Sequence, residues 1–196
     1  MAAHKLLLHP SDHLCPTVGV EVLSDRLQAI GLIGQPVKPG DSLFYPTGEN
    51  FLQLITFLGC SPTIELDPPS DPALVDAASA AGRFCHVFLS CTDELQFRTD
   101  AQTQPPRCPQ CRVPERAWQQ KIKTWQKDSE NISWQCPDCG FTGLLTDLAF
   151  RKTAGFGRTF VEIRGIYPSE AVPGEALRGT LRSLTGGDWK PIYIRE

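Results

Sequence analysis

The sequence predicts an α+β, or mixed α/β, globular domain into which a small cysteine-rich module is inserted. Outside residues 105–150, helix-like apolar periodicity alternates with short apolar runs that are typical of strands. Inside that range, four of the eight cysteines stand in two C-x2-C pairs, flanked on both sides by polar or basic segments. We therefore divide the chain into a discontinuous domain, residues 1–104 plus 151–196, and an inserted module at 105–150.

The composition excludes several classes of protein. The chain has 196 residues, of which 41% are hydrophobic and 21% are charged, as is usual for a globular protein. The apolar run Leu6–Leu8 is too short for a signal peptide, and no later run is long enough to span a membrane. We therefore expect a cytoplasmic protein without a membrane partner. A net charge of −3 also lacks the dense basic field of a dedicated nucleic-acid binder.

The first hundred residues alternate between helical and strand patterns. The third expected helix begins at Asp71-Pro72, because Asp caps free amides and Pro is tolerated at the first helical position. The expected helices cover residues 18–30, 49–58 and 72–81. The expected strands cover residues 41–45, 63–66 and 84–89. Polar or basic composition predicts a linker at 92–107 and a flexible joint at 151–158.

Two segments of the chain follow the same plan. Residues 43–66 and 165–194 both read as strand, Tyr-Pro-Thr or Tyr-Pro-Ser, Gly-Glu, helix, Gly turn and strand. Aligning Gly48 with Gly174 places Phe51 opposite Leu177 and Ile55 opposite Leu181, which keeps one apolar stripe on each helix. This pattern indicates either an internal strand-helix-strand repeat or two unrelated units with similar turns. A true repeat would place both units in one sheet, with the more apolar first helix fully buried or facing a partner.

Cys108, Cys111, Cys136 and Cys139 form a C-x2-C, x24, C-x2-C array. In a reducing compartment, such pairs are interpreted first as metal ligands and not as disulfides. Two residues between the thiols allow the backbone to turn around an ion, and four thiolates fill a tetrahedral coordination sphere. The predicted site is therefore structural, because no coordination position remains for water or substrate.

The motifs CPQC and CPDCG resemble those of the zinc-ribbon class, over residues 105–150 only. The resemblance implies one structural Zn²⁺, with iron as the less favoured ion. It also implies that Trp118, Trp125 and Trp134 cover the site. Many ribbons have Gly where this chain has Arg112, so we expect the first knuckle to bend differently from the second. The strands implied by the resemblance lie at 117–125, 132–135 and 141–148.

Three functions are consistent with these patterns. The favoured one is a non-enzymatic zinc-binding protein that acts through protein-protein contacts, as an adaptor or an assembly or accessory factor. The second is a nucleic-acid-binding protein whose basic and aromatic side chains grip phosphates and bases. The candidate residues for contacts with either kind of partner are Arg112, Arg116, Trp118, Lys121, Lys123 and Trp125.

The third function is an enzyme that has a Cys/His site besides its structural zinc. The candidates for a second metal site or a Cys nucleophile are His9, His13, Cys15, His86 and Cys91. Their spacing matches no known catalytic motif. Terminal histidines are usually solvated, and a lone buried cysteine usually behaves as a small hydrophobic residue. An enzymatic role is therefore the weakest of the three predictions.

Overall fold

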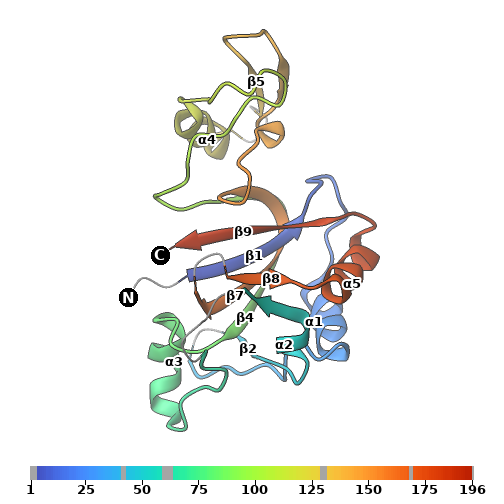
Figure 1. Cartoon of the computed structure of the whole chain (residues 1–196), viewed down its shortest axis with the longest axis vertical. Coiled ribbons are helices and arrows are strands. Elements are labelled where there is room, and N and C mark those ends of the chain that lie inside the picture. Colours follow the sequence, from blue (N-terminus) through green and yellow to red (C-terminus); the bar gives the residue numbers. More distant parts are fainter. Residues whose placement is uncertain (1–3, 41–42, 59–63, 129–131, 168–169, 196) are drawn as a thin grey trace.

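The computed structural model has a mixed α and β fold, as expected (Figure 1). It describes residues 4–40, 43–58, 64–128, 132–167 and 170–195. The described helices are α1 (Val20–Ala29), α2 (Phe51–Leu54), α3 (Pro72–Ala80), α4 (Trp118–Lys127) and α5 (Glu175–Thr185), with a 3-10 turn at Leu145–Asp147. The described strands are β1 (His4–Pro10), β2 (Tyr45–Pro46), β3 (Ile55–Phe57), β4 (His86–Arg98), β5 (Ser133–Gln135), β6 (Thr142–Leu144), β7 (Gly155–Ile166), β8 (Ala171–Pro173) and β9 (Trp189–Arg195).

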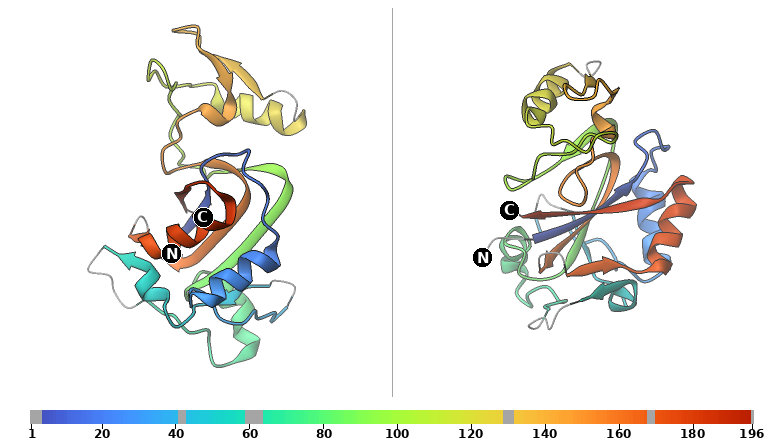
Figure 2. Two further views of the ribbon diagram at one scale, coloured as in Figure 1. Left: turned by 90° about the vertical axis from the view of Figure 1, so that its right-hand side faces the viewer. Right: turned by 45° about the horizontal axis from the view of Figure 1, so that its top comes forward.

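The main sheet has five antiparallel strands in the order β2-β4-β7-β1-β9. It is strongly curved, and the long strands β4 and β7 run from the helical layer towards the cysteine module (Figure 2). Alternate residues of β1 and β7, such as Leu6 and Val161, face the largest apolar cluster. Helices α1, α2 and α5 contribute Leu27, Phe51 and Leu181 to the same cluster, so these helices cover one face of the sheet.

The opposite face combines a small apolar cluster with paired charges. Leu7, Phe160, Ile192 and Ile194 form the apolar cluster. Beside it, Lys5 Nζ lies 3.2 Å from Glu162 Oε1, and Arg164 pairs with the same carboxylate. The Arg164 guanidinium also lies over the ring of Phe88, 4.1 Å from its centroid. These buried charges are tolerated because each has an opposite charge at contact distance.

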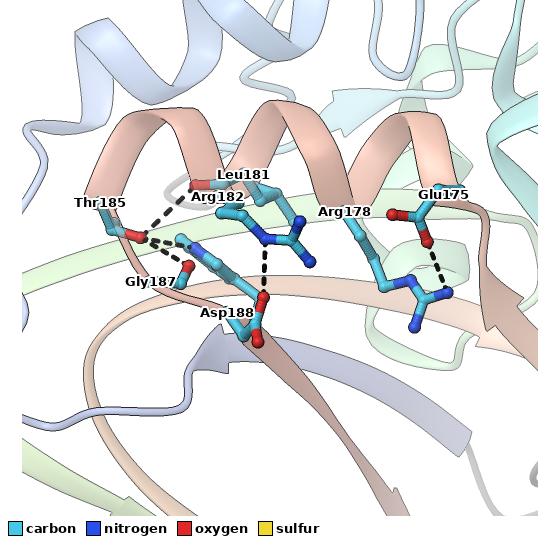
Figure 3. Close-up of polar contacts among 8 residues, drawn as sticks. Glu175, Arg178, Leu181, Arg182, Thr185, Gly187 and Asp188 are labelled. Carbon is cyan, nitrogen blue, oxygen red and sulfur yellow. Dashed lines mark hydrogen bonds and ion pairs between the residues drawn. The ribbon is translucent and has the colours of Figure 1, made fainter.

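Polar contacts fix the end of α5 to the start of β9 (Figure 3). Gly186 ends the helix in the left-handed conformation, with a φ of 73°. Arg182 Nε donates to Asp188 Oδ1 over 2.7 Å, and Trp189 Nε1 donates to Thr185 Oγ1 over 3.0 Å. The helix therefore holds a fixed position over the sheet edge formed by β9.

The cysteine module lies between β4 and β7 in the sequence and at one end of both strands in space (Figure 1). Its apolar cluster contains Trp118, Trp125 and Trp134 and also includes Phe97 of β4 and Phe156 of β7. The Phe97 and Phe156 rings lie 4.7 Å apart, and Phe156 contacts Trp125 at 5.4 Å. The two long strands thus carry the apolar side chains on which the module packs.

Two of the expected helices are confirmed, and one is wrong over half its length. Helices α1 and α3 lie within the expected ranges, and Asp71 Oδ1 accepts a hydrogen bond from the Ala73 amide as a cap. The helix expected at 49–58 ends after Leu54 and continues as strand β3, which pairs with β8. The run Ile55–Phe57 is rich in β-branched and aromatic side chains, so a neighbouring strand stabilises it better than a helix does.

The two segments of the predicted repeat differ more than expected. Helix α2 has 4 residues and α5 has 11. Phe51, Ile55, Leu177 and Leu181 are buried in one cluster, but Leu58 is 70% exposed. Strands β2 and β9 do belong to one sheet, at its opposite edges. Whether the segments descend from a duplication stays a prediction.

The strand predictions are correct in part. Strand β4 begins near the expected place but extends to Arg98, so most of the first half of the expected linker is strand. Likewise, β7 occupies the second half of the expected joint at 151–158. Asp41, Ser42 and Thr63 lie outside the described residues, and Ile64–Leu66 forms no strand. Strand β1 and most of β7 were not expected from the sequence, although β1 contains the apolar run Leu6–Leu8 and β7 contains Phe160, Val161 and Ile163.

His86 should make folding stability depend on pH. The side chain is fully buried, between Ser79 Oγ and the Phe84 carbonyl, and burial lowers its pKa from 6.5 to about 4. The unfolded chain therefore binds a proton below pH 6.5 that the folded protein does not, and stability falls as the pH drops from 6.5 to 4. We expect His86→Gln to reduce this loss by about 3 kcal/mol in denaturant titrations of metal-free protein. An equal loss in His86→Gln and wild type would contradict the prediction, and His13→Gln is the control.

Candidate metal centre

The four cysteine sulfurs converge on one point. Their Sγ atoms all lie within 4.8 Å of one another. The Cys108–Cys139 and Cys111–Cys136 sulfur pairs are 3.8 and 3.7 Å apart. A tetrahedral ion with metal–sulfur bonds of about 2.3 Å requires sulfurs about 3.8 Å apart, whereas a disulfide bond is about 2.05 Å long. The donor set therefore fits a four-thiolate metal site of the kind found in zinc ribbons.

The two knuckles have the same backbone geometry. The Arg112 amide donates to the Cys108 carbonyl over 3.1 Å, and the Gly140 amide donates to the Cys136 carbonyl over 3.0 Å. Arg112 and Gly140 are both left-handed, with φ angles of 66° and 73°. The expectation that Arg112 bends the first knuckle differently is therefore wrong. Closing the turn around the sulfurs requires the left-handed conformation, and Arg112 adopts it at a cost of about 1–2 kcal/mol.

Strands and a helix together carry the knuckles. The range 117–125, expected as a strand, is instead helix α4, because Trp118, Ile122 and Trp125 recur at helical spacing and bury one face. Strands β5 and β6 form a hairpin close to the expected ranges. The expected third strand is short, since β6 passes at Leu145 into a 3-10 turn. The module is thus a two-stranded hairpin and a helix with the sulfurs between them.

Backbone amides stabilise negative charge on the sulfurs. Burial raises the pKa of Cys108, but hydrogen bonds from the amides of Cys111 and Gln110 and from neighbouring thiols outweigh this effect and lower the pKa to about 7. A thiol that loses its proton near neutral pH binds a cation without a large cost of deprotonation. In the same knuckle, the Val113 amide favours the Cys111 thiolate, but burial and hydrogen bonds with the neighbouring thiols outweigh this effect and raise the pKa of Cys111 to about 12. Cys108 is therefore the thiol of this knuckle that loses its proton more readily.

The candidate partner residues divide into exposed cations and buried rings. Arg112, Arg116 and Lys123 are exposed. Lys121 is half-buried, and its Nζ lies 3.8 Å from Glu115 Oε2. The predicted aromatic residues are not available for stacking, because Trp118 and Trp125 are each only 5% exposed. These two tryptophans belong to the apolar core of the module, which also contains Cys108 and Cys136. That the tryptophans cover the sulfur cluster stays a prediction.

A pocket of about 520 Å³ lies where the module joins the sheet. Arg107, Arg116 and Arg151 line it together with Gln104, and none of the described lining residues is acidic. Arg107 Nη1 donates to the Arg112 carbonyl, while Arg116 and Arg151 are exposed. This grouping of arginines was not expected from the sequence, because Arg107 and Arg151 are far apart in the chain. The only indication of it in the sequence is the basic composition of residues 151–158.

The residues of the enzyme alternative do not come together. Among the described residues, the four knuckle cysteines are the only group of three or more His, Cys, Asp or Glu side chains that can hold a metal ion. His9, His13, Cys15, His86 and Cys91 form no such group. His86 is enclosed by Phe44, Phe84 and Phe88. Burial raises the pKa of Cys91, and it raises that of Cys85, which precedes His86, to about 12, so neither thiol is activated as a nucleophile.

Comparisons with protein-family models, curated proteins and solved structures gave no significant match. No helix in the described ranges is long and apolar enough to cross a membrane.

Removing the metal should unfold the module. A structural four-cysteine site contributes about 10–16 kcal/mol, whereas the apolar cluster of the module is smaller than the main core. We expect chelation, or Cys136→Ser, to increase amide exchange across α4 and the β5–β6 hairpin by at least about 100-fold, while β1 and β7 stay protected. Unchanged exchange in α4 after verified metal removal would falsify this. Cys15→Ser, outside the cluster, is the matched control.

The left-handed residues of the two knuckles provide a matched pair of substitutions. Arg112→Gly should raise the free energy of unfolding by about 1 kcal/mol, because Gly adopts a positive φ without strain. Gly140→Ala should lower it by a similar amount, since a Cβ there meets no atom within 4 Å and only the backbone conformation matters. Thermal unfolding of the metal-loaded variants measures both effects. A destabilised Arg112→Gly protein would show that the arginine side chain, and not its backbone, matters.

Proposed function

We propose that Cys108, Cys111, Cys136 and Cys139 hold one structural Zn²⁺ and that the protein acts without catalysis, through protein-protein contacts, as an adaptor or assembly factor. The observation that carries this proposal is the closed set of four sulfurs within 4.8 Å. Four thiolates complete the coordination of Zn²⁺ and leave no position for a substrate or an activated water. The ion then shapes a surface and performs no chemistry.

The character of the surface supports protein contacts. Five large aliphatic side chains of the described residues are more than half exposed, and the largest exposed fractions are 73% for Leu14 and 70% for Leu58. Leu52, on the outer side of α2, is 57% exposed. The apolar helix that was predicted to meet a partner therefore has an exposed leucine available for that contact. The tryptophans that would stack bases are buried. Apolar contact area is therefore more accessible than a base-stacking surface.

The test is affinity purification of the protein, tagged in its chromosomal copy, from its source organism with nuclease present throughout. We expect one protein to co-purify in near-stoichiometric amount, and to bind the purified, zinc-loaded chain in a calorimetric titration. A protein that co-purifies only when nuclease is omitted, or the absence of any protein in near-stoichiometric amount, would contradict the proposal. The Cys136→Ser variant shows whether the captured protein requires the folded module.

Nucleic-acid binding is a second candidate function, favoured by the pocket of three arginines. Guanidinium groups that share a pocket without a carboxylate attract phosphates, and Arg binds phosphate in a bidentate manner. If this function holds, Arg116→Gln combined with Arg151→Gln should reduce the salt dependence of RNA or DNA binding by about two phosphate contacts. Lys123→Gln, which removes a positive charge outside the pocket, is the control. Fluorescence anisotropy at several salt concentrations decides between the two functions.

A further inference from the structure

Strand β4 has one paired edge and one edge that is largely open. On one side it pairs with β7 along most of its length. On the other side it pairs with β2 only at His86 and Val87. Figure 2 shows β4 as the outermost strand of the curved sheet on the side of α1. The backbone groups beyond Val87 that point away from β7 are therefore unpaired unless another segment covers them.

The direction of each amide follows from the alternation of an antiparallel ladder. The Cys85 amide points away from β7, because it donates to the Glu65 carbonyl over 2.7 Å. Val87, two residues on, has the same direction and faces Tyr45 of β2. Leu89 and Cys91 come next in this series. Neither backbone amide has a hydrogen-bond partner among the described residues.

Strand β2 stops too early to cover these groups. Extending its register would place Leu43 opposite Leu89. Leu43 forms no strand, so the described pairing of β2 with β4 ends at Tyr45 and Val87. Phe44 points away from β4, as the alternation requires, and exchanges both backbone hydrogen bonds with Val37 on the far side of β2. Leu43 is 46% exposed.

The opposite edge of the sheet is protected, which makes the β4 edge distinctive. In β9, the residues whose amides point away from β1 include Pro191, Tyr193 and Arg195. Pro191 has no N–H, Tyr193 donates to the Lys152 carbonyl, and Arg195 donates to Asp100 Oδ2. Proline and local caps are the usual means of blocking an edge strand. Among the residues that the structure describes, no such device covers Leu89 and Cys91.

A groove of about 560 Å³ lies beside this edge. One wall is the β4 segment from Cys91 to Gln96, and the other is the segment Thr17–Val20 that leads into α1. The register of β4 shifts between Cys91 and Gln96, and Arg158 holds the resulting bulge by donating to the carbonyls of Asp93 and His13. The bulge limits pairing to the four residues Phe88–Cys91, enough for a short strand.

The groove carries negative charge. Asp93 and Glu94 line it, are exposed, and form no ion pair in the described part of the chain. Glu21 lies close by in the first turn of α1. An occupant with lysine or arginine next to its paired residues would neutralise these carboxylates, whereas an acidic segment would be repelled.

We propose that the outer edge of β4 at Phe88–Cys91 binds an extended segment of a partner polypeptide, which adds as a strand and places a Lys or Arg side chain against Asp93 and Glu94. The N–H and C=O groups of Leu89 and Cys91 supply affinity through main-chain hydrogen bonds, and the groove and its charge supply selectivity. This inference rests on the proposed function and assigns its contact surface.

The probe is a library of random nine-residue peptides, displayed on phage and selected against the full zinc-loaded protein. The selected sequences should be rich in Lys or Arg, and a synthetic copy should protect the Leu89 and Cys91 amides from hydrogen exchange. Cys91→Pro should weaken peptide binding at least tenfold, because it removes an outward N–H and no hydrogen bond to β7. Cys91→Ala, which loses the thiol but keeps that N–H, should bind as wild type does.

Two results would overturn the inference: selection of no peptide, or equal binding to Cys91→Pro and Cys91→Ala. Should Cys91→Pro fail to fold, the double variant Asp93→Lys, Glu94→Lys takes its place, and unchanged peptide affinity there would also overturn it. In the free protein, the Leu89 amide must exchange faster than that of Phe88; slow exchange would mean that the edge is already covered. A co-purified partner that binds Cys91→Pro and Cys91→Ala equally would refute this inference and leave the proposed function intact.

Discussion

Much of the module depends on four sulfur atoms that lie within 4.8 Å of one another. Thiolates at this separation repel one another strongly unless a cation lies between them. The two knuckles approach each other from segments 24 residues apart, and helix α4 and strand β5 lie in the segment that connects them. An ion that binds all four sulfurs closes this long loop and replaces the repulsion with bonds. Metal coordination by these sulfurs would also offset the strain of the left-handed Arg112 in the first knuckle.

The pair β4–β7 connects this module to the rest of the protein. In the sheet, the two strands bury residues such as Val87 and Val161 under the helices. Beyond the bulge, Phe97 and Phe156 of the same strands pack against the module's tryptophans. The bulge that separates the two regions also produces the groove beside β4. One departure from regular pairing therefore places the module and limits the open edge.

The sequence was most informative where local chemistry determines the structure. Cysteine spacing indicated the metal ligands, and Asp71-Pro72 marked the start of α3. It failed where a distant partner decides between helix and strand. Ile55–Phe57 became a strand because β8 is available, and Trp118–Trp125 became a helix because its apolar face meets Phe97 and Phe156. The open edge of β4 and the cluster of three arginines could not be predicted, since both arise from residues brought together only by folding.

The protein combines a closed cluster of four cysteine sulfurs, a buried aromatic core, and a largely open strand edge with an acidic groove. None of these features provides an activated nucleophile or an open coordination position. They are the basis of the proposed role in protein-protein contacts. The central claim, four sulfurs on one fully coordinated ion, is tested most directly by X-ray absorption at the zinc edge on protein purified without added metal. The account predicts one zinc per chain with four sulfur neighbours at about 2.3 Å. Oxygen or nitrogen in the first coordination shell, or no zinc at all, would contradict it.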